Sequence, residues 1–172
     1  MRPIWISCFL AAALLSSGCG DLLSLHPLYS ERDKVFDTAY EGQWENKDDR
    51  LTVRRAGDHY DVTLKTKLSP SQPVEYEVRF VEIGGARFAD ILLVESLGHM
   101  FLKVRVSESQ LRFAFFDSEW LRERIPHEKS VLAQGKTQAV LTARTPELRN
   151  LVAKYGSDPK AYDQETVLDR MK

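Results

Sequence analysis

Apolar and polar residues alternate along several stretches in the middle of the chain. The stretch 74–80 reads VEYEVRF, and 60–65 and 111–115 repeat the same alternation. A period of two, built from β-branched and aromatic residues, is typical of strands that bury one face. Turn residues separate these stretches, and the pair Gly84-Gly85 suits a two-residue hairpin because glycine accepts positive φ. The pattern predicts seven strands, at 41–46, 50–56, 59–67, 73–83, 86–95, 99–106 and 110–116.

The last third of the chain changes from strand signals to helix signals. Asp117 is a good N-cap residue for a short helix, and a brief strand near 139–143 follows it. Thr145-Pro146-Glu147 then starts a second helix, whose apolar residues keep helical spacing up to Gly156. Asp158-Pro159 repeats the start signal, so we expect a final helical segment, which would carry Tyr162, Val167, Leu168 and Met171.

Consecutive hairpins make an antiparallel meander, and seven or eight strands favour closure of such a sheet into a barrel. We therefore predict an α+β, mainly β fold, in which a meander is curled or closed into a seven- or eight-stranded barrel-like sheet with short C-terminal helices packed on it. The β domain would span residues 40–143 and the helices residues 144–172. Residues 20–39 show neither period, so we expect a tether that ends by packing Val35 and Phe36 onto the domain.

Large aromatic side chains are expected to fill much of the barrel. An eight-stranded barrel is just wide enough to be filled by its own side chains or to hold one small ligand. A filled interior would leave binding to the outer surface or to the groove between helices and sheet, whereas a hollow interior would indicate a carrier. Besides Trp44 in the first strand, the predicted apolar interior consists of Tyr60, Tyr76, Phe80, Phe88, Phe113 and Phe115.

The first residues have the layout of a secretory signal. Arg2 is followed by the uncharged apolar run 4–15, and small residues precede Cys19. A membrane-spanning helix needs about 20 apolar residues, so this run is too short to span a bilayer. We expect residues 1–18 to be removed as a signal peptide.

The end of this segment, LLSSGC at 14–19, resembles the lipobox of bacterial lipoproteins. The resemblance implies that Cys19 carries a diacylglyceryl thioether and an amide-linked acyl chain, with residues 19–39 as the lipidated cysteine and tether. Two or more acyl chains anchor a protein stably, whereas one binds only marginally. Gly20 follows in place of the Asp that is the familiar signal for retention in the inner membrane, so we expect the outer membrane, facing the periplasm. The second cysteine, Cys8, lies in the removed segment, and we consider a Cys8–Cys19 disulfide a minor alternative.

Two further resemblances concern the mature chain. Gly42-Gln43-Trp44 resembles the G-x-W opening of lipocalin-like barrels, in which the Trp plugs the closed end and the far end holds an apolar ligand. An ordinary core tryptophan is the alternative reading of Trp44. Other short pieces are similar to small bacterial lipoproteins of uncharacterised function, a group that implies a lipid anchor but no activity; these are 25–29, 35–37, 41–44, 101–102, 120–121 and 141–143.

Charge and motifs exclude several function classes. The 24 Lys and Arg residues are balanced by 25 Asp and Glu, which gives no electrostatic case for a nucleic-acid partner. The chain has no G-x-S-x-G elbow, P-loop or G-x-G-x-x-G motif. The histidines are too far apart in sequence to indicate a zinc site, and we expect them to be surface or satisfied residues: His26, His59, His99 and His127.

The sequence therefore predicts a membrane-anchored lipoprotein of the bacterial envelope that acts as a non-catalytic binding or interaction module. We expect no enzyme activity, no catalytic or metal-binding residues, and no cofactor other than the covalent lipid on Cys19. Expected partners are the membrane, through the anchor, and an envelope protein or a small apolar ligand. The alternatives are a lipocalin-like carrier of a small apolar ligand and, with less support, an envelope enzyme without a recognisable motif.

Overall fold

The computed structural model describes residues 22–68, 71–93, 98–125, 131–134 and 138–172. The expected signal peptide 1–18 and Cys19 lie outside the described residues, as does His127. Within the described part of the chain, no helix combines the length and apolar character needed to span a bilayer.

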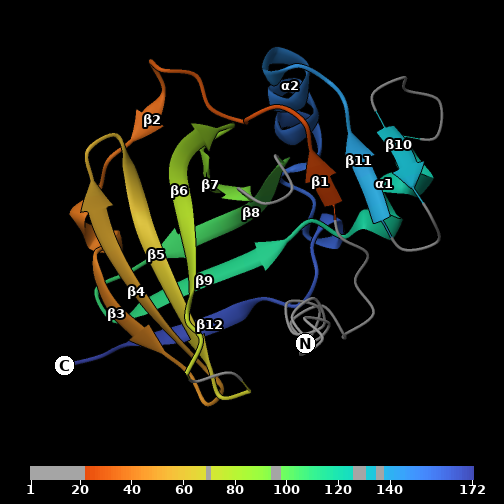
Figure 1. Cartoon of the computed structure of the whole chain (residues 1–172). Helices are drawn as coiled ribbons and strands as arrows, with labels where there is room; N and C mark the ends of the chain where they lie inside the picture. The colour runs from red at the N-terminus through yellow and green to blue at the C-terminus, as the bar shows by residue number, and fades with distance from the viewer. Residues whose placement is uncertain (1–21, 69–70, 94–97, 126–130, 135–137) are drawn as a thin grey trace, which may run out of the picture.

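Eight antiparallel strands close into a barrel (Figure 1). The last of them pairs with β9 on one side and with β3 on the other, and this pairing closes the sheet. The predicted mainly β barrel with short helices packed on it is thus confirmed, and the seven predicted strands match within about two residues. In order around the barrel the strands are β3 (Gly42–Glu45), β4 (Asp49–Ala56), β5 (His59–Thr66), β6 (Val74–Ile83), β7 (Ala86–Leu93), β8 (Gly98–Val106), β9 (Gln110–Phe115) and β12 (Thr166–Arg170).

The prediction of a helical segment after Asp158 is wrong beyond its first turn. Asp158 does cap a helix, but only the single 3₁₀ turn η3 (Pro159–Ala161), and β12 follows. β12 lies between two strand edges that would otherwise be unpaired, and its Leu168, opposite Leu111 of β9, is fully buried inside the barrel. Pairing on both sides, together with a β-branched pair at 166–167, outweighs the local helix signal.

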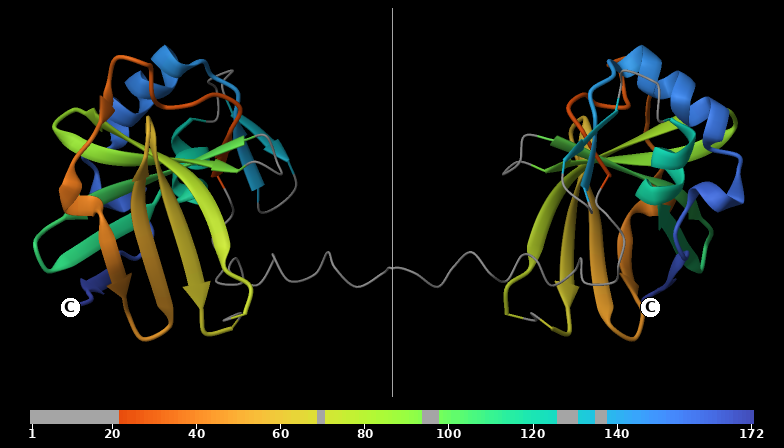
Figure 2. Two further views of the ribbon diagram at one scale, coloured as in Figure 1. Left: turned by 60° about the vertical axis from the view of Figure 1, so that its left-hand side comes forward. Right: turned by 90° about the vertical axis from the view of Figure 1, so that its right-hand side faces the viewer.

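The segment 22–40 is part of the folded domain, so the prediction of a tether is wrong for these residues. β1 (Leu22–Ser24) runs parallel to β11 (Gln138–Leu141), which pairs in turn with β10 (Val131–Gln134). These three strands extend the sheet beyond β8, to one side of the barrel (Figure 2).

The remainder of this N-terminal segment also packs on the domain. β2 (Lys34–Val35) pairs with β6, and the Leu28 side chain has no exposed surface. Val35 packs half-buried against the barrel core, as expected, whereas Phe36 remains 41% exposed.

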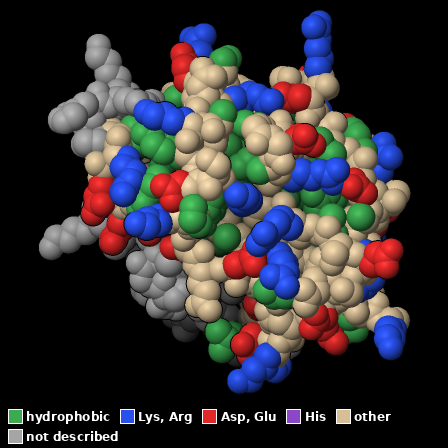
Figure 3. Space-filling model, turned by 180° about the vertical axis from the view of Figure 1, so that it is seen from behind, with side chains coloured by type: hydrophobic (Ala, Val, Ile, Leu, Met, Phe, Trp, Pro, Cys, Tyr) green, Lys and Arg blue, Asp and Glu red, His purple; other side chains and the backbone are tan. Residues whose placement is uncertain are grey.

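The helices cover the outside of the sheet. In α1 (Ser118–Arg124), the Asp117 carboxylate accepts hydrogen bonds from two backbone N–H groups, as its predicted N-cap role requires. α2 (Thr145–Tyr155) buries Leu148, Leu151 and Val152 in an outer core that is separate from the core inside the barrel. The face of the molecule opposite to the one seen in Figure 1 carries interspersed basic and acidic side chains (Figure 3), in keeping with the near-zero net charge.

Candidate functional site

Aromatic side chains fill one end of the barrel, which we call the closed end. The 3₁₀ helix η2 (Thr38–Tyr40) precedes β3 and brings Tyr40 into the interior, where it is fully buried. Its ring stacks on that of Phe80, with 3.9 Å between centroids, and Tyr60 meets Phe80 edge-on at 5.1 Å. This packing leaves the interior at this end occupied by the protein's own side chains.

Trp44 is fixed by a cationic side chain from the other end of the sequence. Its indole Nε1 donates to the Tyr40 carbonyl at 2.9 Å, and the Arg170 guanidinium lies 4.0 Å from the indole ring centroid. The same guanidinium donates to the carbonyl oxygens of Ala39 at 2.6 Å, Glu41 at 2.9 Å and Glu108 at 2.8 Å. We call this arrangement the Arg170 clamp; it joins η2, the β8–β9 hairpin and the last strand.

The glycine of the G-x-W sequence makes room for this clamp. Gly42 has a φ of +131°, which side-chain-bearing residues rarely adopt. A Cβ at this position would lie 2.8 Å from Nη1 of Arg170. The glycine of the motif therefore leaves room for the Arg170 side chain. Arg170 was not predicted as a contact of Trp44, because the sequence pattern predicts a helical segment at this position.

The opposite end of the barrel, which we call the far end, presents inward-facing apolar side chains that solvent reaches. These side chains are half-buried, unlike the fully buried ones around Trp44. Val74 and Leu68, on either side of the β5–β6 connection, are more exposed still, at 41% and 80%. Burial raises the pKa of the Tyr76 phenol there, so this group stays uncharged. Leu51, directly opposite Trp44 in the ladder, lies between the two ends. Strand pairing places five inward side chains at the far end: Leu64, Tyr76, Ile91, Phe113 and Phe115.

The structure places most of the predicted interior residues inside the barrel. Trp44, Tyr60 and Phe80 are buried in the barrel core. Three more of the predicted residues face inward and are half-buried at the far end: Tyr76, Phe113 and Phe115.

The prediction for Phe88 is wrong. Phe88 faces outward and stacks on Phe116 in the outer core, with 6.1 Å between ring centroids. Its neighbours Ala89 and Ile91 face inward instead. Because residues 86–93 bury apolar side chains on both faces of β7, alternation alone could not decide which set points inward.

Asp90 and His99 form a buried acid–base pair on the outer face of the barrel, beneath the N-terminal segment. The Asp90 carboxylate, 1% exposed, lies 2.6 Å from Nδ1 of His99, and its second oxygen accepts the Leu28 backbone N–H at 2.6 Å. The nearby Ser24 hydroxyl donates to the His26 carbonyl at 2.8 Å. The pair therefore holds the N-terminal segment against β7 and β8, which is a structural role.

The other described histidines give no metal centre. His59 contacts the carboxylates of Asp58 at 3.0 Å and Asp61 at 3.2 Å on the surface. Among the residues that the structure describes, no group of three or more His, Cys, Asp or Glu side chains could hold a metal ion.

Comparison with known proteins adds no further identification. No protein-family model matches the chain, and neither a curated protein nor a solved structure shows significant similarity to it.

Proposed function

We propose that this protein is a lipid-anchored, non-catalytic binding module of the bacterial envelope, and that it binds an apolar group at the far end of its barrel. The observation that carries the proposal is the contrast between the two ends. The closed end is filled around Trp44 and held by the Arg170 clamp, whereas the far end presents apolar side chains to solvent. Exposed apolar groups gathered at one place on a folded domain are typical of binding sites.

The proposed anchor would keep the barrel close to the membrane. The lipobox-like sequence ends at Cys19, and β1 begins at Leu22, only three residues later. Three residues span at most about 10 Å, so an acylated Cys19 would hold β1 within roughly that distance of the lipid headgroups. This arrangement suits the capture of an apolar ligand at a membrane surface rather than transport away from it.

The proposed absence of catalysis follows from how the described chemical groups are used. Both carboxylate oxygens of Asp90 are occupied by His99 and by the Leu28 N–H, and these groups are buried under the N-terminal segment. The far end is lined by apolar side chains, with no convergent acid and base among its five inward residues.

A lipocalin-like carrier is the second candidate, and the placement of Trp44 and Gly42 at the closed end favours it. In such a carrier the ligand would enter the same end but reach deeper, toward Trp44. The two candidates therefore differ in the depth of the ligand. Trp44 fluorescence reports this depth directly in a Trp120→Phe background, because residues 20–172 contain two tryptophans, Trp44 and Trp120.

The test is a fluorescence titration of residues 20–172 with the neutral apolar probe N-phenyl-1-naphthylamine. We expect saturable binding that Leu68→Ser and Val74→Ser each weaken about fivefold, because each loses roughly 1 kcal/mol of apolar contact. Leu25→Ser and Phe36→Ser are matched controls, since Leu25 (54% exposed) and Phe36 (41% exposed) are exposed apolar residues outside the far end. Equal weakening by the control variants, or no saturable binding, would contradict the proposal. A shift of Trp44 emission on binding would favour the deep, carrier-like mode.

A further inference from the structure

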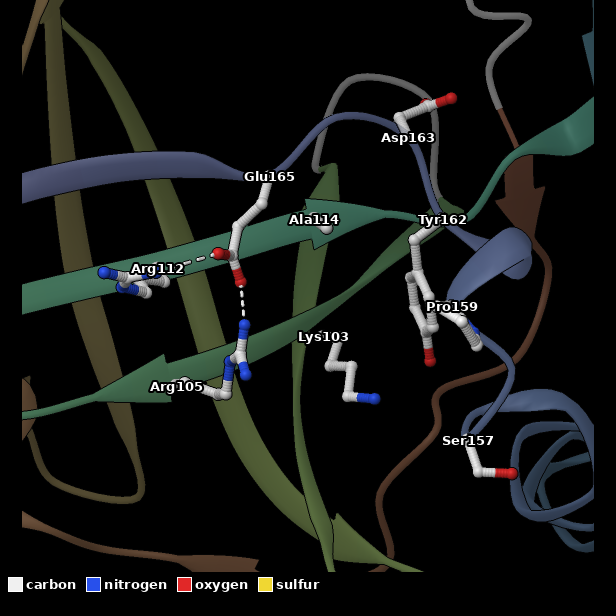
Figure 4. A pocket seen from close by; sticks show the side chains of 9 residues that line it. All are labelled: Lys103, Arg105, Arg112, Ala114, Ser157, Pro159, Tyr162, Asp163 and Glu165. Carbon is white, nitrogen blue, oxygen red and sulfur yellow. Dashed lines mark hydrogen bonds and ion pairs between the residues drawn. The ribbon is translucent and has the colours of Figure 1, made fainter.

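Three basic side chains lie together on the outer face of β8 and β9. Arg105 and Arg112 are directly opposite each other in the ladder, and Lys103 lies on the same face two residues from Arg105. Like charges directly opposite each other destabilise a sheet. With Tyr162 and Pro159, the three cations line a hollow of about 290 Å³ between the barrel and the segment that follows α2 (Figure 4).

The acidic side chains at this hollow do not balance the three cations. Glu165 pairs with both Arg105 and Arg112, and its distance to Nη1 of Arg112 is 3.3 Å. Asp163 also lines the hollow, but its side chain is turned away from the basic groups (Figure 4). One carboxylate therefore faces three cations, which leaves an excess of about two positive charges.

Lys103 carries much of this excess. Its Nζ donates to the Gly156 carbonyl at 2.9 Å and lies 5.0 Å from the centroid of the Tyr162 ring. Within the described residues Lys103 forms no ion pair, although an ammonium group has three donors. Partial burial and the neighbouring Arg105 charge lower the pKa of Lys103. A negative charge in the hollow would oppose this lowering of the pKa, because it favours the charged ammonium.

The surroundings hold Lys103 in place for such a contact. The Gly156 carbonyl that accepts from Lys103 also accepts from the Tyr162 hydroxyl at 2.9 Å. A Cβ on Gly156 would lie 2.5 Å from the Val152 carbonyl oxygen and 3.0 Å from the Phe88 ring, so glycine permits this close packing. The ammonium group is thus oriented before any ligand arrives.

We propose that this hollow binds a phosphate group, as inorganic phosphate or as a phosphate monoester, with Lys103 as the principal new ion-pair partner. A phosphate monoester carries a charge of roughly −1.5 to −2 at pH 7, which matches the excess charge better than a single carboxylate does. A guanidinium group has five donors in a planar fork. Arg105 and Arg112 can therefore bind phosphate oxygens while they remain paired with Glu165. The volume is at the lower limit of small-molecule sites, which suits a phosphate with a small organic group against Tyr162 and Pro159.

The test uses residues 20–172, which form both hydrophobic cores of the described structure. Titration calorimetry with inorganic phosphate gives the free-ligand arm, and flotation with phosphatidylcholine vesicles with and without phosphatidic acid, a lipid phosphate monoester, gives the membrane arm. Binding in the first arm alone identifies a small soluble phosphate, and binding in the second identifies a lipid headgroup. Either result supports the site only if it depends on Lys103.

We expect Lys103→Met to weaken binding about tenfold and Lys103→Arg to retain most of it. The matched control Lys65→Met removes an exposed lysine from the outer face of β5 and should leave affinity unchanged. Glu165→Gln should strengthen binding severalfold, because it removes the carboxylate that competes with the ligand; this opposite sign cannot come from a loss of folding. Absence of binding in both arms, or equal weakening by Lys65→Met, would overturn the proposal.

Discussion

Replacing Arg170 with methionine tests the closure of the barrel most sharply. Methionine keeps an unbranched apolar stem over Trp44 but removes the guanidinium. Three carbonyl oxygens then lose their donor, those of Ala39, Glu41 and Glu108. The variant therefore separates the charge and hydrogen bonds of the clamp from simple filling of space.

The expected loss can be worked out from these contacts. A hydrogen bond from a charged group contributes about 1.5–3 kcal/mol, and we use the lower value for the two half-buried acceptors, Ala39 and Glu41. The exposed bond to Glu108 adds little, and the contact with the Trp44 ring adds about 1 kcal/mol. We expect Arg170→Met to lower the free energy of unfolding by about 4 kcal/mol, which corresponds to a fall in Tm of roughly 8–16 °C for a domain of this size.

The assay is urea unfolding of residues 20–172, followed by circular dichroism and by tryptophan fluorescence. Arg170→Lys should lose about 2 kcal/mol, because a single ammonium keeps the charge but cannot reach all three carbonyl groups. The control Arg54→Met, at an exposed position on β4, should stay within about 0.5 kcal/mol of the parent. A stability of Arg170→Met within 1 kcal/mol of the parent would refute the assignment of the clamp.

Three further outcomes are expected. Gly42→Ala should destabilise the domain by about 2 kcal/mol, measured by the same unfolding assay, because alanine would adopt a strained φ and collide with Arg170; an unchanged stability would contradict this. The Arg87 guanidinium holds the pKa of Asp37 below its usual range, and Arg105 does the same for Glu165, so the folded state binds fewer protons than the unfolded state near pH 4. Tm should therefore be steady from pH 7 to 5 and fall below about pH 4, with a smaller fall in Glu165→Gln. An equal fall in the variant would show that the Glu165 carboxylate does not contribute to the loss of stability in acid. Cys19→Ser should abolish acyl labelling and release the protein from membranes, and unchanged fractionation would refute the proposed anchor.

The local pattern of apolar and polar residues was sufficient to predict most strands of the barrel. Alternation over 59–66 and 74–83 reflects strands with one face on the core, and the hairpin at Gly84-Gly85 has two glycines with positive φ, at +60° and +76°. The cap of α1 was also predictable, because its contacts lie within a few residues of each other. These features depend on neighbours in sequence. The Thr145 hydroxyl, which we expected to cap α2, instead donates to the distant Pro27 carbonyl at 2.7 Å, and Arg144 takes the N-cap position.

The missed features depend on contacts between distant parts of the chain. β12 forms because β3 and β9 offer unpaired edges, which the local signal at Asp158-Pro159 does not reveal. The Arg170 clamp joins residues more than 120 positions apart, as the bond from Arg170 to Ala39 shows. Glu165 likewise reaches Arg105 and Arg112 only once the barrel has closed. A single sequence gives no indication of such pairings.

The measurement that tests the proposed function most directly is NMR chemical-shift mapping of residues 20–172 with N-phenyl-1-naphthylamine. The account predicts saturable shifts at Tyr76, Ile91, Phe113 and Phe115 of the far end, while the Trp44 indole signal stays unchanged. Shifts confined to the outer surface around α2, or no shifts at all, would contradict binding at the far end of the barrel.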